Sequence, residues 1–488
     1  MNTESFENDV TGGPAVSGAG RRHVSRRTVL KAAGATALAA TAASTLSVPA
    51  WAEGSEGAED VPWDFIVVGA GFAGVTAARE LRARGKRVLI LEARGRIGGR
   101  TWTDTYAGQQ IEVGGTWVEA TQPNIGRELK RYNLLLEDDD APSRMMMPTP
   151  DGPKAFTADE ANARMGAAFD KLFAGARDYF PQPYAPTTRM DLLQQIDKLS
   201  LRDKLNEIKL PLADELMING QTAIYSGGTS SMGALTMFAH WWALSGYSIQ
   251  GWGETTYHRL KTGTGGMISA MLNEAKPTLM LNNPVSAITD DGRWARVTTR
   301  AGKTYSAKGV IVAMPVNSWS TIKWSPGLPA VHTAAASQGL SVKNALKLWI
   351  HARGSDRVVA QGAEGGSKIP LLIPNKKTAE GQLYIAFSVD PTVDPTNKTQ
   401  VRDEIRKIGA DLDIIGIRAH NWGTDEFSRG GWTFRKPGQL TTLYPDILNQ
   451  ATPRITFASG DIANGWSGFI DGAIESGMRA AQLANGEM

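Results

Sequence analysis

The stretch WDFIVVGAGFAGVTAARELRARGKRVLILE, residues 63–92, constrains the fold of this chain more than any other segment. Residues 65–68 form an apolar run suited to a buried parallel strand, and they lead directly into the pattern G-x-G-x-x-G. In such a pattern the first glycine makes the turn, the second lets the backbone approach a pyrophosphate, and the third lets a helix pack on its strand. The segment predicts a βαβ unit that binds a dinucleotide.

The residues after the glycines complete this unit. The pattern predicts a helix with one apolar face over 75–84 and a second buried strand over 88–91, which ends at Glu92. An acid at this distance suits a bidentate hydrogen bond to a ribose diol. The next residues, ARGRIGGR (93–100), bring two more glycines and arginines close to the ribose acid, where they suit a second pair of phosphates.

Composition excludes several other kinds of site. The chain has no cysteine, which excludes disulfides, thiolate nucleophiles, cysteine-ligated metals and a flavin attached through sulfur. Its six histidines form no H-x-x-x-H or H-E-x-x-H pattern, so no metal site is predicted. The net charge is only +3 and no basic block stands out beyond the N-terminus, which argues against nucleic-acid binding.

The first 52 residues have the pattern of a signal. A polar start is followed by SRRTVLK (25–31), an Ala-rich apolar run and the small-x-small site AWA (50–52), which resembles a twin-arginine export signal. The alternative is a membrane anchor, but the run is short and mostly Ala and Thr. No other stretch predicts a transmembrane helix. We therefore expect export to the periplasm or beyond, and the sequence leaves open whether the signal is cleaved.

Three segments together resemble the flavin monoamine oxidase family. They are LEARGRIGGR (91–100), IEVGGTWV (111–118) and SGDIANGWSGFIDGAIESGMRAA (459–481), and the resemblance extends over residues 63–485. It implies FAD as the cofactor. In this family the last segment passes the ribityl chain and then opens a helix whose N-terminus faces the pyrimidine edge of the flavin, which stabilises negative charge there. We expect the FAD to be held without a covalent bond, because cysteine is absent and no histidine lies in these segments.

The resemblance also implies an α/β fold, with a Rossmann-like FAD-binding domain of the amine oxidase type and an inserted α+β substrate domain. We expect the FAD-binding domain to comprise 63–150, 265–330 and 435–488, and the substrate domain 151–264, mostly helical, and 331–434. The residues that the resemblance assigns to the cofactor are Gly69, Ala70, Gly71, Phe72, Ala73, Gly74, Glu92, Ala93, Arg94, Gly98, Gly99, Arg100, Thr101, Gly114, Gly115, Thr116, Trp117, Val285, Gly460, Asp461, Gly472 and Ile474.

Within the family, ETTYHRLKTGTGGM (254–267) and GGWTFRKPGQL (430–440) are most similar to the nicotine oxidoreductase, hydroxynicotine oxidase and pseudooxynicotine oxidase branch. That likeness makes Trp432 and Asn464 the two walls before the flavin. It makes Lys347, in NALKLWIHA (344–352), the lysine that relatives hold near flavin N5. Alternation along that strand places Lys347 on one face with Trp349 and His351. The residues that we expect to bind substrate are Trp117, Tyr225, Glu254, Trp432 and Asn464.

The implied chemistry is oxidation of an amine by hydride transfer from the carbon beside nitrogen to flavin N5, giving an imine that hydrolyses to a carbonyl. A nicotine-like or other aryl-alkyl amine is the expected substrate, and oxygen or a redox protein the electron acceptor. An L-amino-acid oxidase, a polyamine oxidase and a non-catalytic flavin-binding protein are the alternatives. The segment GGTWVEATQ (114–122) has no arginine for an amino-acid carboxylate, and Glu254 alone is thin support for a polyamine. Whether the chain forms a homodimer stays open.

Overall fold

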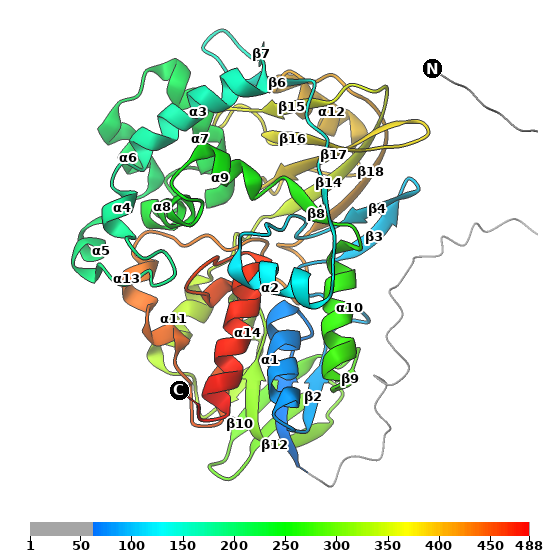
Figure 1. Cartoon of the computed structure of the whole chain (residues 1–488), viewed down its shortest axis with the longest axis vertical. Helices are drawn as coiled ribbons and strands as arrows, with labels where there is room; N and C mark the ends of the chain where they lie inside the picture. Colours follow the sequence, from blue (N-terminus) through cyan, green and yellow to red (C-terminus); the bar gives the residue numbers. More distant parts are fainter. Residues whose placement is uncertain (1–61, 488) are drawn as a thin grey trace, which may run out of the picture. The chain divides into compact units, whose positions relative to one another are not determined.

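The computed structural model describes residues 62–487, and Figure 1 shows its helices and strands. The export signal predicted for residues 1–52 lies outside this part of the chain. Across 62–487, no helix is both long enough and apolar enough to cross a bilayer. Two large sheets organise the described residues, and each is built from segments that lie far apart in the sequence.

The first sheet has eight strands in the order β13-β10-β11-β12-β1-β2-β9, with β19 also paired to β12. The strands β1, β2, β9, β12 and β19 run parallel, as the βαβ pattern predicts, while β11 is antiparallel to both of its neighbours. The strands are β1 (Trp63–Val68), β2 (Val88–Leu91), β9 (Thr278–Met280), β10 (Val285–Asp290), β11 (Ala295–Thr299), β12 (Thr304–Val312), β13 (Lys323–Ser325) and β19 (Ile455–Phe457).

Three helices lie side by side on one face of this sheet: α1 (Phe72–Ala83), α10 (Gly263–Ala275) and α14 (Ile470–Ala484) (Figure 1). Glycines permit the closest contacts. A Cβ on Gly74 would lie 2.0 Å from the carbonyl oxygen of Gly69, and one on Gly477 would lie 2.3 Å from that of Ala73. The last helix of the chain therefore packs directly against the first helix of the glycine motif, which brings the two ends of the described chain together.

The second sheet has seven strands in the order β18-β14-β17-β16-β15-β6-β7. Its strands are β6 (Arg144–Met147), β7 (Lys154–Phe156), β14 (Leu346–Arg353), β15 (Val358–Gln361), β16 (Leu371–Lys377), β17 (Gly381–Ser388) and β18 (Asp413–Asn421). Strand β6 pairs with β15 and so belongs to this sheet, although it precedes the domain boundary predicted at residue 150. The division into two domains stays a prediction, and this boundary would have to move toward the N-terminus.

Strand β14 shows the predicted alternation. Leu346 and Leu348 belong to the apolar core between this sheet and helix α12 (Lys398–Lys407). On the opposite face Trp349 packs against Ile111, and its indole Nε1 donates to the carbonyl oxygen of Glu112 at 2.9 Å. Lys347 has the same orientation as Trp349, so it points toward the glycine-rich segment after β4 (Gln109–Glu112).

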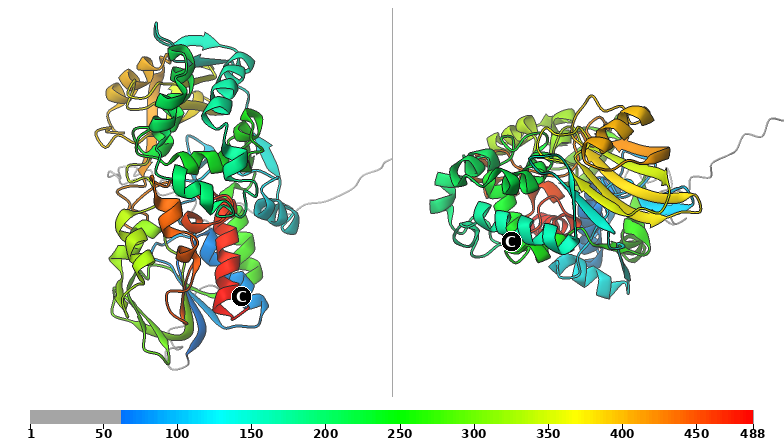
Figure 2. Two further views of the ribbon diagram at one scale, coloured as in Figure 1. Left: turned by 90° about the vertical axis from the view of Figure 1, so that its left-hand side faces the viewer. Right: turned by 90° about the horizontal axis from the view of Figure 1, so that it is seen from above.

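A layer of helices lies beside this second sheet, and both views in Figure 2 show it in green next to the yellow strands. Residues 151–264 are mostly helical, as predicted. The layer comprises α3 (Ala158–Leu172), α4 (Ala176–Tyr179), α5 (Met190–Ile196), α6 (Leu201–Ile208), α7 (Leu212–Ser226), α8 (Leu235–Leu244) and α9 (Ile249–Glu254). Phe238 of α8 holds it together, with its ring 5.0 Å from those of Phe173 and Trp252.

Shorter elements connect these layers. Helix α11 (Ala330–Gln338) is not among the elements that the sequence predicts. Besides β4 and short 3-10 turns, the connecting elements are β3 (Thr103–Tyr106), α2 (Pro123–Arg131), β5 (Leu136–Asp138), β8 (His258–Leu260), α11 (Ala330–Gln338) and α13 (Gln439–Leu443).

Candidate active site

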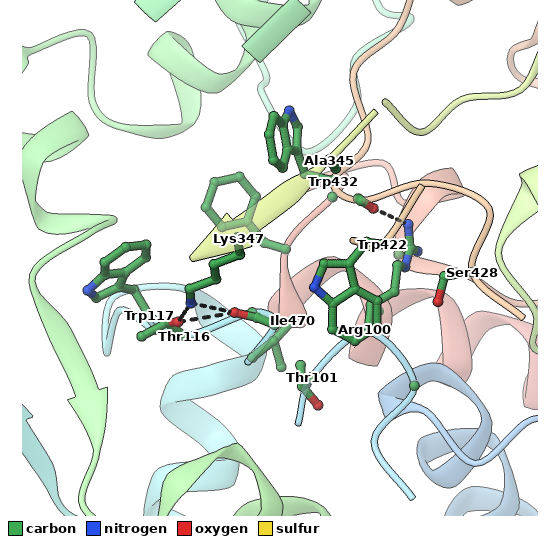
Figure 3. Close-up of a pocket in the computed structure, with 18 of the residues that line it drawn as sticks. Arg100, Thr101, Thr116, Trp117, Ala345, Lys347, Trp422, Ser428, Trp432 and Ile470 are labelled. Atoms are coloured by element: carbon green, nitrogen blue, oxygen red, sulfur yellow. Dashed lines mark hydrogen bonds between the residues drawn. The ribbon is translucent and has the colours of Figure 1, made fainter. Parts of the chain in front are cut away.

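A single cavity of about 810 Å³ runs from the glycine motif of the first sheet to the second sheet and the helical layer. Its walls come from α1, β2, the 98–101 and 114–117 segments, α7, α9, β14, β17 and the loops before α13 and α14. Figure 3 shows part of this lining, with Lys347 reaching down from its strand. A cavity of this size and mixed origin is typical of a site for a large cofactor together with a small ligand.

The glycine end of the cavity is shaped for close approach of a ligand to the backbone. Gly69 has a φ of +108°, and a Cβ there would lie 2.7 Å from the carbonyl oxygen of Ala313. Gly71 bridges to Gly98, so the two glycine segments lie side by side. The first turn of α1, which has no side-chain cap and no acidic residue, opens onto the cavity at Phe72. Free backbone N–H groups at this end suit the phosphates of a dinucleotide.

Glu92 lies at the carboxyl end of β2 and is 3% exposed. Its Oε2 accepts a hydrogen bond from the N–H of Ala70 at 2.8 Å, and its Oε1 accepts one from the N–H of Arg94 at 2.8 Å. Each carboxylate oxygen can accept more than one hydrogen bond, so the anchored carboxylate still has acceptor capacity for the two hydroxyls of a ribose. Glu92 lines the cavity, and its geometry fits the predicted contact.

Arg100 joins the cavity to the C-terminal segment. Its Nη2 lies 2.7 Å from Oδ1 of Asp461, and its Nη1 donates to the carbonyl oxygen of Gly431 at 2.8 Å. Asp461 is fully buried; burial alone would raise the pKa of its carboxyl, but Arg100 and the Thr433 hydroxyl outweigh this and lower it. Asp461 therefore stays ionised behind the cavity wall and holds the Arg100 guanidinium at the cavity surface.

Lys347 is the buried amine of the site. It is 4% exposed, and its Nζ donates to the carbonyl oxygen of Gly114 at 2.8 Å and to the Thr116 hydroxyl (Figure 3). Burial lowers the pKa of Lys347 to about 7, against the opposing effects of Glu112 and Asp139. The cavity thus contains an amine that changes its charge close to neutral pH.

Aromatic rings surround this amine. The Nζ of Lys347 lies 5.5 Å from the ring of Trp117 and 5.7 Å from that of Phe387. Asp139 holds Trp117 by accepting from its Nε1 at 2.7 Å. Trp432 lies beyond Phe387, with the two rings edge to face at 6.2 Å, and its Nε1 donates to the carbonyl oxygen of Tyr225 at 3.0 Å. The cavity lining includes Asp139 and Phe387 as well as the predicted Trp117, Tyr225 and Trp432.

The structure does not place Asn464 at the cavity. The N–H of Asn464 donates to Oε1 of Glu475 at 2.7 Å, and the residue is absent from the cavity lining, unlike Phe469 five residues later. Gly468, beside it, packs against Thr433, so Phe469 approaches the cavity next to Trp432. Phe469 is the aromatic side chain that this segment contributes.

Most of the predicted cofactor residues line the cavity, and five of them do not. A Cβ on Gly472 would lie 2.2 Å from the carbonyl oxygen of Trp466, so this glycine permits the loop to turn rather than contact with a ligand. Glu254, predicted to bind substrate, lines the cavity from the end of α9. The residues behind the lining are Ala70, Gly74, Asp461, Gly472 and Ile474.

Several lining residues escaped the sequence analysis. Phe387 is directly opposite Lys347 in the antiparallel pair β14–β17, a register that no local pattern reveals. Asp139 lies within the acidic run EDDD (137–140), yet it is buried and accepts a hydrogen bond from Trp117. Trp241, a buried residue of α8, lines the cavity as well.

Comparison with known proteins matches this geometry. The family model described as flavin containing amine oxidoreductase matches residues 72–485. The chain is 33% identical to a pseudooxynicotine dehydrogenase of a Pseudomonas species over 470 residues, which covers 93% of this chain and 94% of the relative. It is 32% identical to a nicotine dehydrogenase of Pseudomonas putida, with 86% of this chain and 88% of the relative covered.

Solved structures show the same fold. A triple mutant of putrescine oxidase superposes with a TM-score of 0.76 at 23% identity, covering 88% of this chain and 99% of the other. The cyclohexylamine oxidase of Brevibacterium oxydans superposes with a TM-score of 0.71 at 20% identity, covering 87% and 99%. These likenesses confirm the predicted α/β architecture with a Rossmann-like sheet.

Proposed function

This chain belongs to the family of flavin-containing amine oxidoreductases, and we propose that it uses FAD to oxidise a nicotine-like or other aryl-alkyl amine. The observation that carries the proposal is the position of Lys347. Its amine lies beside the rings of Trp117 and Phe387, in the same cavity whose other end is formed by the glycine motif. A cofactor held at the glycine end and an amine held among the rings would share one continuous space.

The aromatic walls support a substrate with an apolar body. Trp117, Phe387, Trp432 and Phe469 present faces and edges that pack well against a ring or an alkyl chain. Aromatic faces also attract an ammonium group by about 0.5–2 kcal/mol, which offsets only part of the cost of enclosing the cation. The names of the two Pseudomonas relatives, pseudooxynicotine dehydrogenase and nicotine dehydrogenase, point to the same class of substrate.

The cavity offers little to an amino-acid carboxylate. Among the described residues, the arginines that line it are Arg94, Arg100 and Arg300, and each is ion-paired with an acid. An L-amino-acid oxidase needs a cation that is free to bind the substrate carboxylate, so these pairings favour an amine.

The chain's own residues would orient the amine and control its charge. A bound flavin supplies the acceptor for the hydride from the carbon beside nitrogen. The amine must be neutral for its lone pair to assist the loss of hydride, and enclosure in the cavity disfavours its cation. Lys347, with a pKa lowered to about 7 by burial, adds a positive charge near the rings only at and below neutral pH. This charge further discourages binding of the protonated amine.

The flavin is proposed to be FAD without a covalent bond. The chain has no cysteine, and no histidine is among the residues, within 62–487, that line the cavity. The length of the cavity supports a dinucleotide, because Glu92 and Val285 line one part of it and Lys347 another.

The N-terminal SRRTVLK segment (25–31) supports a further part of the proposal, export by the twin-arginine route, which carries folded proteins with their cofactors. Fusing residues 1–60 to a reporter that is active only after export tests it. We expect an exported reporter, and loss of export when Arg26 and Arg27 are both changed to Lys. A reporter exported equally well with both lysines contradicts this route.

A substrate screen tests the enzymatic proposal. The purified flavoprotein is incubated with nicotine, pseudooxynicotine, other aryl-alkyl amines, putrescine and L-amino acids, and hydrogen peroxide in air and dye reduction are followed in parallel. We expect turnover of at least one aryl-alkyl amine well above that of putrescine or any amino acid. The comparison of peroxide with dye reduction then identifies the electron acceptor. Preferential oxidation of an amino acid or a polyamine contradicts the proposed substrate class.

A further inference from the structure

Three carboxylates meet one imidazole beside the cavity, in a cluster formed by Glu119, Asp138, Glu254 and His258. The Nε2 of His258 lies 2.9 Å from Oε2 of Glu254 and 3.5 Å from Oε2 of Glu119. On the other side of the ring, Nδ1 lies 2.8 Å from Oδ1 of Asp138. The cluster joins the segment after Trp117, the end of β5, the end of α9 and the start of β8.

The cluster has more negative than positive charge. Across residues 62–487, neither Glu119, Asp138 nor Glu254 has a Lys or Arg within ion-pair distance, and His258 is the ion-pair partner of all three. Arg259, the next residue, is paired with Glu137 and Asp139 instead. Even a protonated imidazole would compensate only one of three negative charges. A divalent cation bound by the neutral imidazole would compensate two of them.

Glu119 gives independent support for a ligand at this cluster. Its side chain is 10% exposed, so desolvation of its carboxylate is nearly complete. The Oε1 accepts from the N–H of Thr121 at 3.0 Å, but the buried Oε2 has no hydrogen-bond donor. A buried carboxylate oxygen without a hydrogen bond costs roughly 1–3 kcal/mol or more, so such an atom ordinarily binds a donor or a metal. This oxygen faces His258.

We propose that Glu119, Glu254 and His258 bind a divalent transition-metal ion, with Zn²⁺ as the representative case. One ligand atom from each of the three residues lies within 4.8 Å of the other two. Tetrahedral Zn²⁺ with bonds of about 2.0–2.2 Å holds neighbouring ligand atoms about 3.3–3.6 Å apart. The distances of 2.9 and 3.5 Å from His258 Nε2 to the two carboxylates need only small side-chain adjustments to meet this geometry.

Asp138 has the position of an outer partner of the metal site. Metal-binding histidines commonly donate their second ring N–H to a carboxylate, which fixes the tautomer and the ring orientation. The contact from His258 Nδ1 to Asp138 is of this kind, and the ion would take the place of the present hydrogen bond between Nε2 and Glu254. Imidazole together with two carboxylates favours zinc or a similar borderline ion over Mg²⁺ or Ca²⁺, which prefer oxygen ligands alone.

The ion would act on the substrate cavity and not on the cofactor end. Glu254 lines the cavity, as do the residues that follow it up to Tyr257. Glu119 comes two residues after Trp117, whose indole also lines the cavity. A bound ion would tie the end of α9 to the Trp117 segment and hold this part of the cavity wall in one position. We therefore expect the ion to change substrate affinity more than the rate of flavin reduction at saturating substrate.

The test is isothermal titration of Zn²⁺ into the purified holoprotein, free of a histidine tag and treated with a chelator. Zinc-edge X-ray absorption on the loaded protein identifies the ligands. We expect one Zn²⁺ per chain, with a mixed nitrogen and oxygen shell. Glu119→Gln, which keeps size and shape, should weaken binding at least tenfold, and Asp138→Asn should weaken it about tenfold as an outer partner. His258→Gln should abolish binding. It is chosen in place of His258→Ala in case the alanine variant does not fold.

The control is Glu207→Gln, which removes an exposed carboxylate of α6 whose one ion-pair partner within residues 62–487 is Lys204. It should bind Zn²⁺ as the parent does. Absence of binding to the parent protein overturns the proposal and leaves the cluster as an ion pair around a protonated imidazole. Binding that is unchanged in Glu119→Gln and His258→Gln also overturns it, because the ion then occupies another site.

Discussion

The amine of Lys347 donates a hydrogen bond to the carbonyl oxygen of Gly114 at 2.8 Å. Lys347 lies in a central strand of the second sheet, and Gly114 lies in a glycine-rich segment of the predicted FAD-binding domain. A Cβ on Gly114 would come within 2.0 Å of the carbonyl oxygen of Arg100, so this segment has no room for a side chain. One buried hydrogen bond thus connects the aromatic part of the cavity with its glycine-lined part.

The charge of Lys347 should control the binding of cationic ligands. Burial lowers its pKa to about 7, so the positive charge is present below pH 7 and is lost as the pH rises above it. An aromatic quaternary ammonium compound, whose own charge is fixed, should bind more weakly as the pH falls through about 7. In Lys347→Met this dependence should disappear. Equilibrium titrations across pH 5.5–9, a range of about 3.5 pH units around that pKa, give the measurement.

Lys398→Met, at the start of α12 and outside the cavity lining, is the matched control and should keep the parent pH dependence. An identical pH dependence in the parent and in Lys347→Met would show that this amine does not titrate in the cavity.

Phe469 should contribute to substrate binding where Asn464 does not. Phe469→Ala removes an aromatic surface that lines the cavity, and burial of such a side chain is worth about 1.5–3 kcal/mol. We expect its kcat/KM for an aryl-alkyl amine to fall about tenfold or more. Asn464→Ala, in the same loop but outside the lining, should stay within about twofold of the parent. Steady-state kinetics on both variants give the measurement. A larger loss of kcat/KM in Asn464→Ala than in Phe469→Ala would show that Asn464 is the wall residue.

Asp461 should be important for stability. Replacing it with Ala leaves Arg100 without its ionic partner in a partly buried position and removes a carboxylate that also accepts from the N–H of Val316 at 2.9 Å. Breaking a buried pair in this way costs about 3–5 kcal/mol. Urea denaturation should show a loss of this size, together with weaker flavin retention. Asp413→Ala, at an exposed ion pair, is the control. If Asp461→Ala lowers the free energy of unfolding as little as this control does, the pair with Arg100 does not stabilise the protein.

Glu92 should contribute to flavin affinity, and the flavin should be released by denaturation. Acid precipitation should leave the yellow colour in the supernatant, since the chain has no cysteine for a covalent bond. Glu92→Ala removes a charge-assisted contact worth about 1.5–3 kcal/mol, so we expect a dissociation constant roughly 10- to 150-fold higher. Asp159→Ala, an exposed acid in the first turn of α3, is the control. Colour that stays in the pellet contradicts non-covalent binding, and an unchanged affinity in Glu92→Ala contradicts the ribose contact.

The glycine motifs were predictable because their roles are local. Gly69 has a positive φ in the turn after β1, and a Cβ on Gly74 would meet Gly69, only five residues earlier, so their spacing alone indicates the structure. The orientation of Lys347 was predictable for the same reason, because side chains alternate along a strand. Phe387 was not, since it meets Lys347 only through the register of two strands separated by a long connection.

Loops were the least predictable parts of the site. In the 459–469 segment a short 3-10 turn and a positive φ at Gly468 decide which side chains reach the cavity, and both depend on packing against Thr433 and α14. A likeness between sequences therefore identified the correct segment, but within it Phe469, and not the predicted Asn464, lines the cavity. Helix α11 was missed because its run of alanines has no clear apolar period.

Anaerobic mixing of the purified flavoprotein with an aryl-alkyl amine shows whether this cavity oxidises amines, and it needs no electron acceptor. The absorbance of the bound flavin is followed by stopped flow. The account predicts that the flavin bleaches fully, with a rate that saturates with amine concentration, and that nicotine or a related amine reduces it faster than putrescine or any L-amino acid. A flavin that stays oxidised with every amine tested, while dithionite reduces it completely, would contradict the assignment of this cavity to amine oxidation.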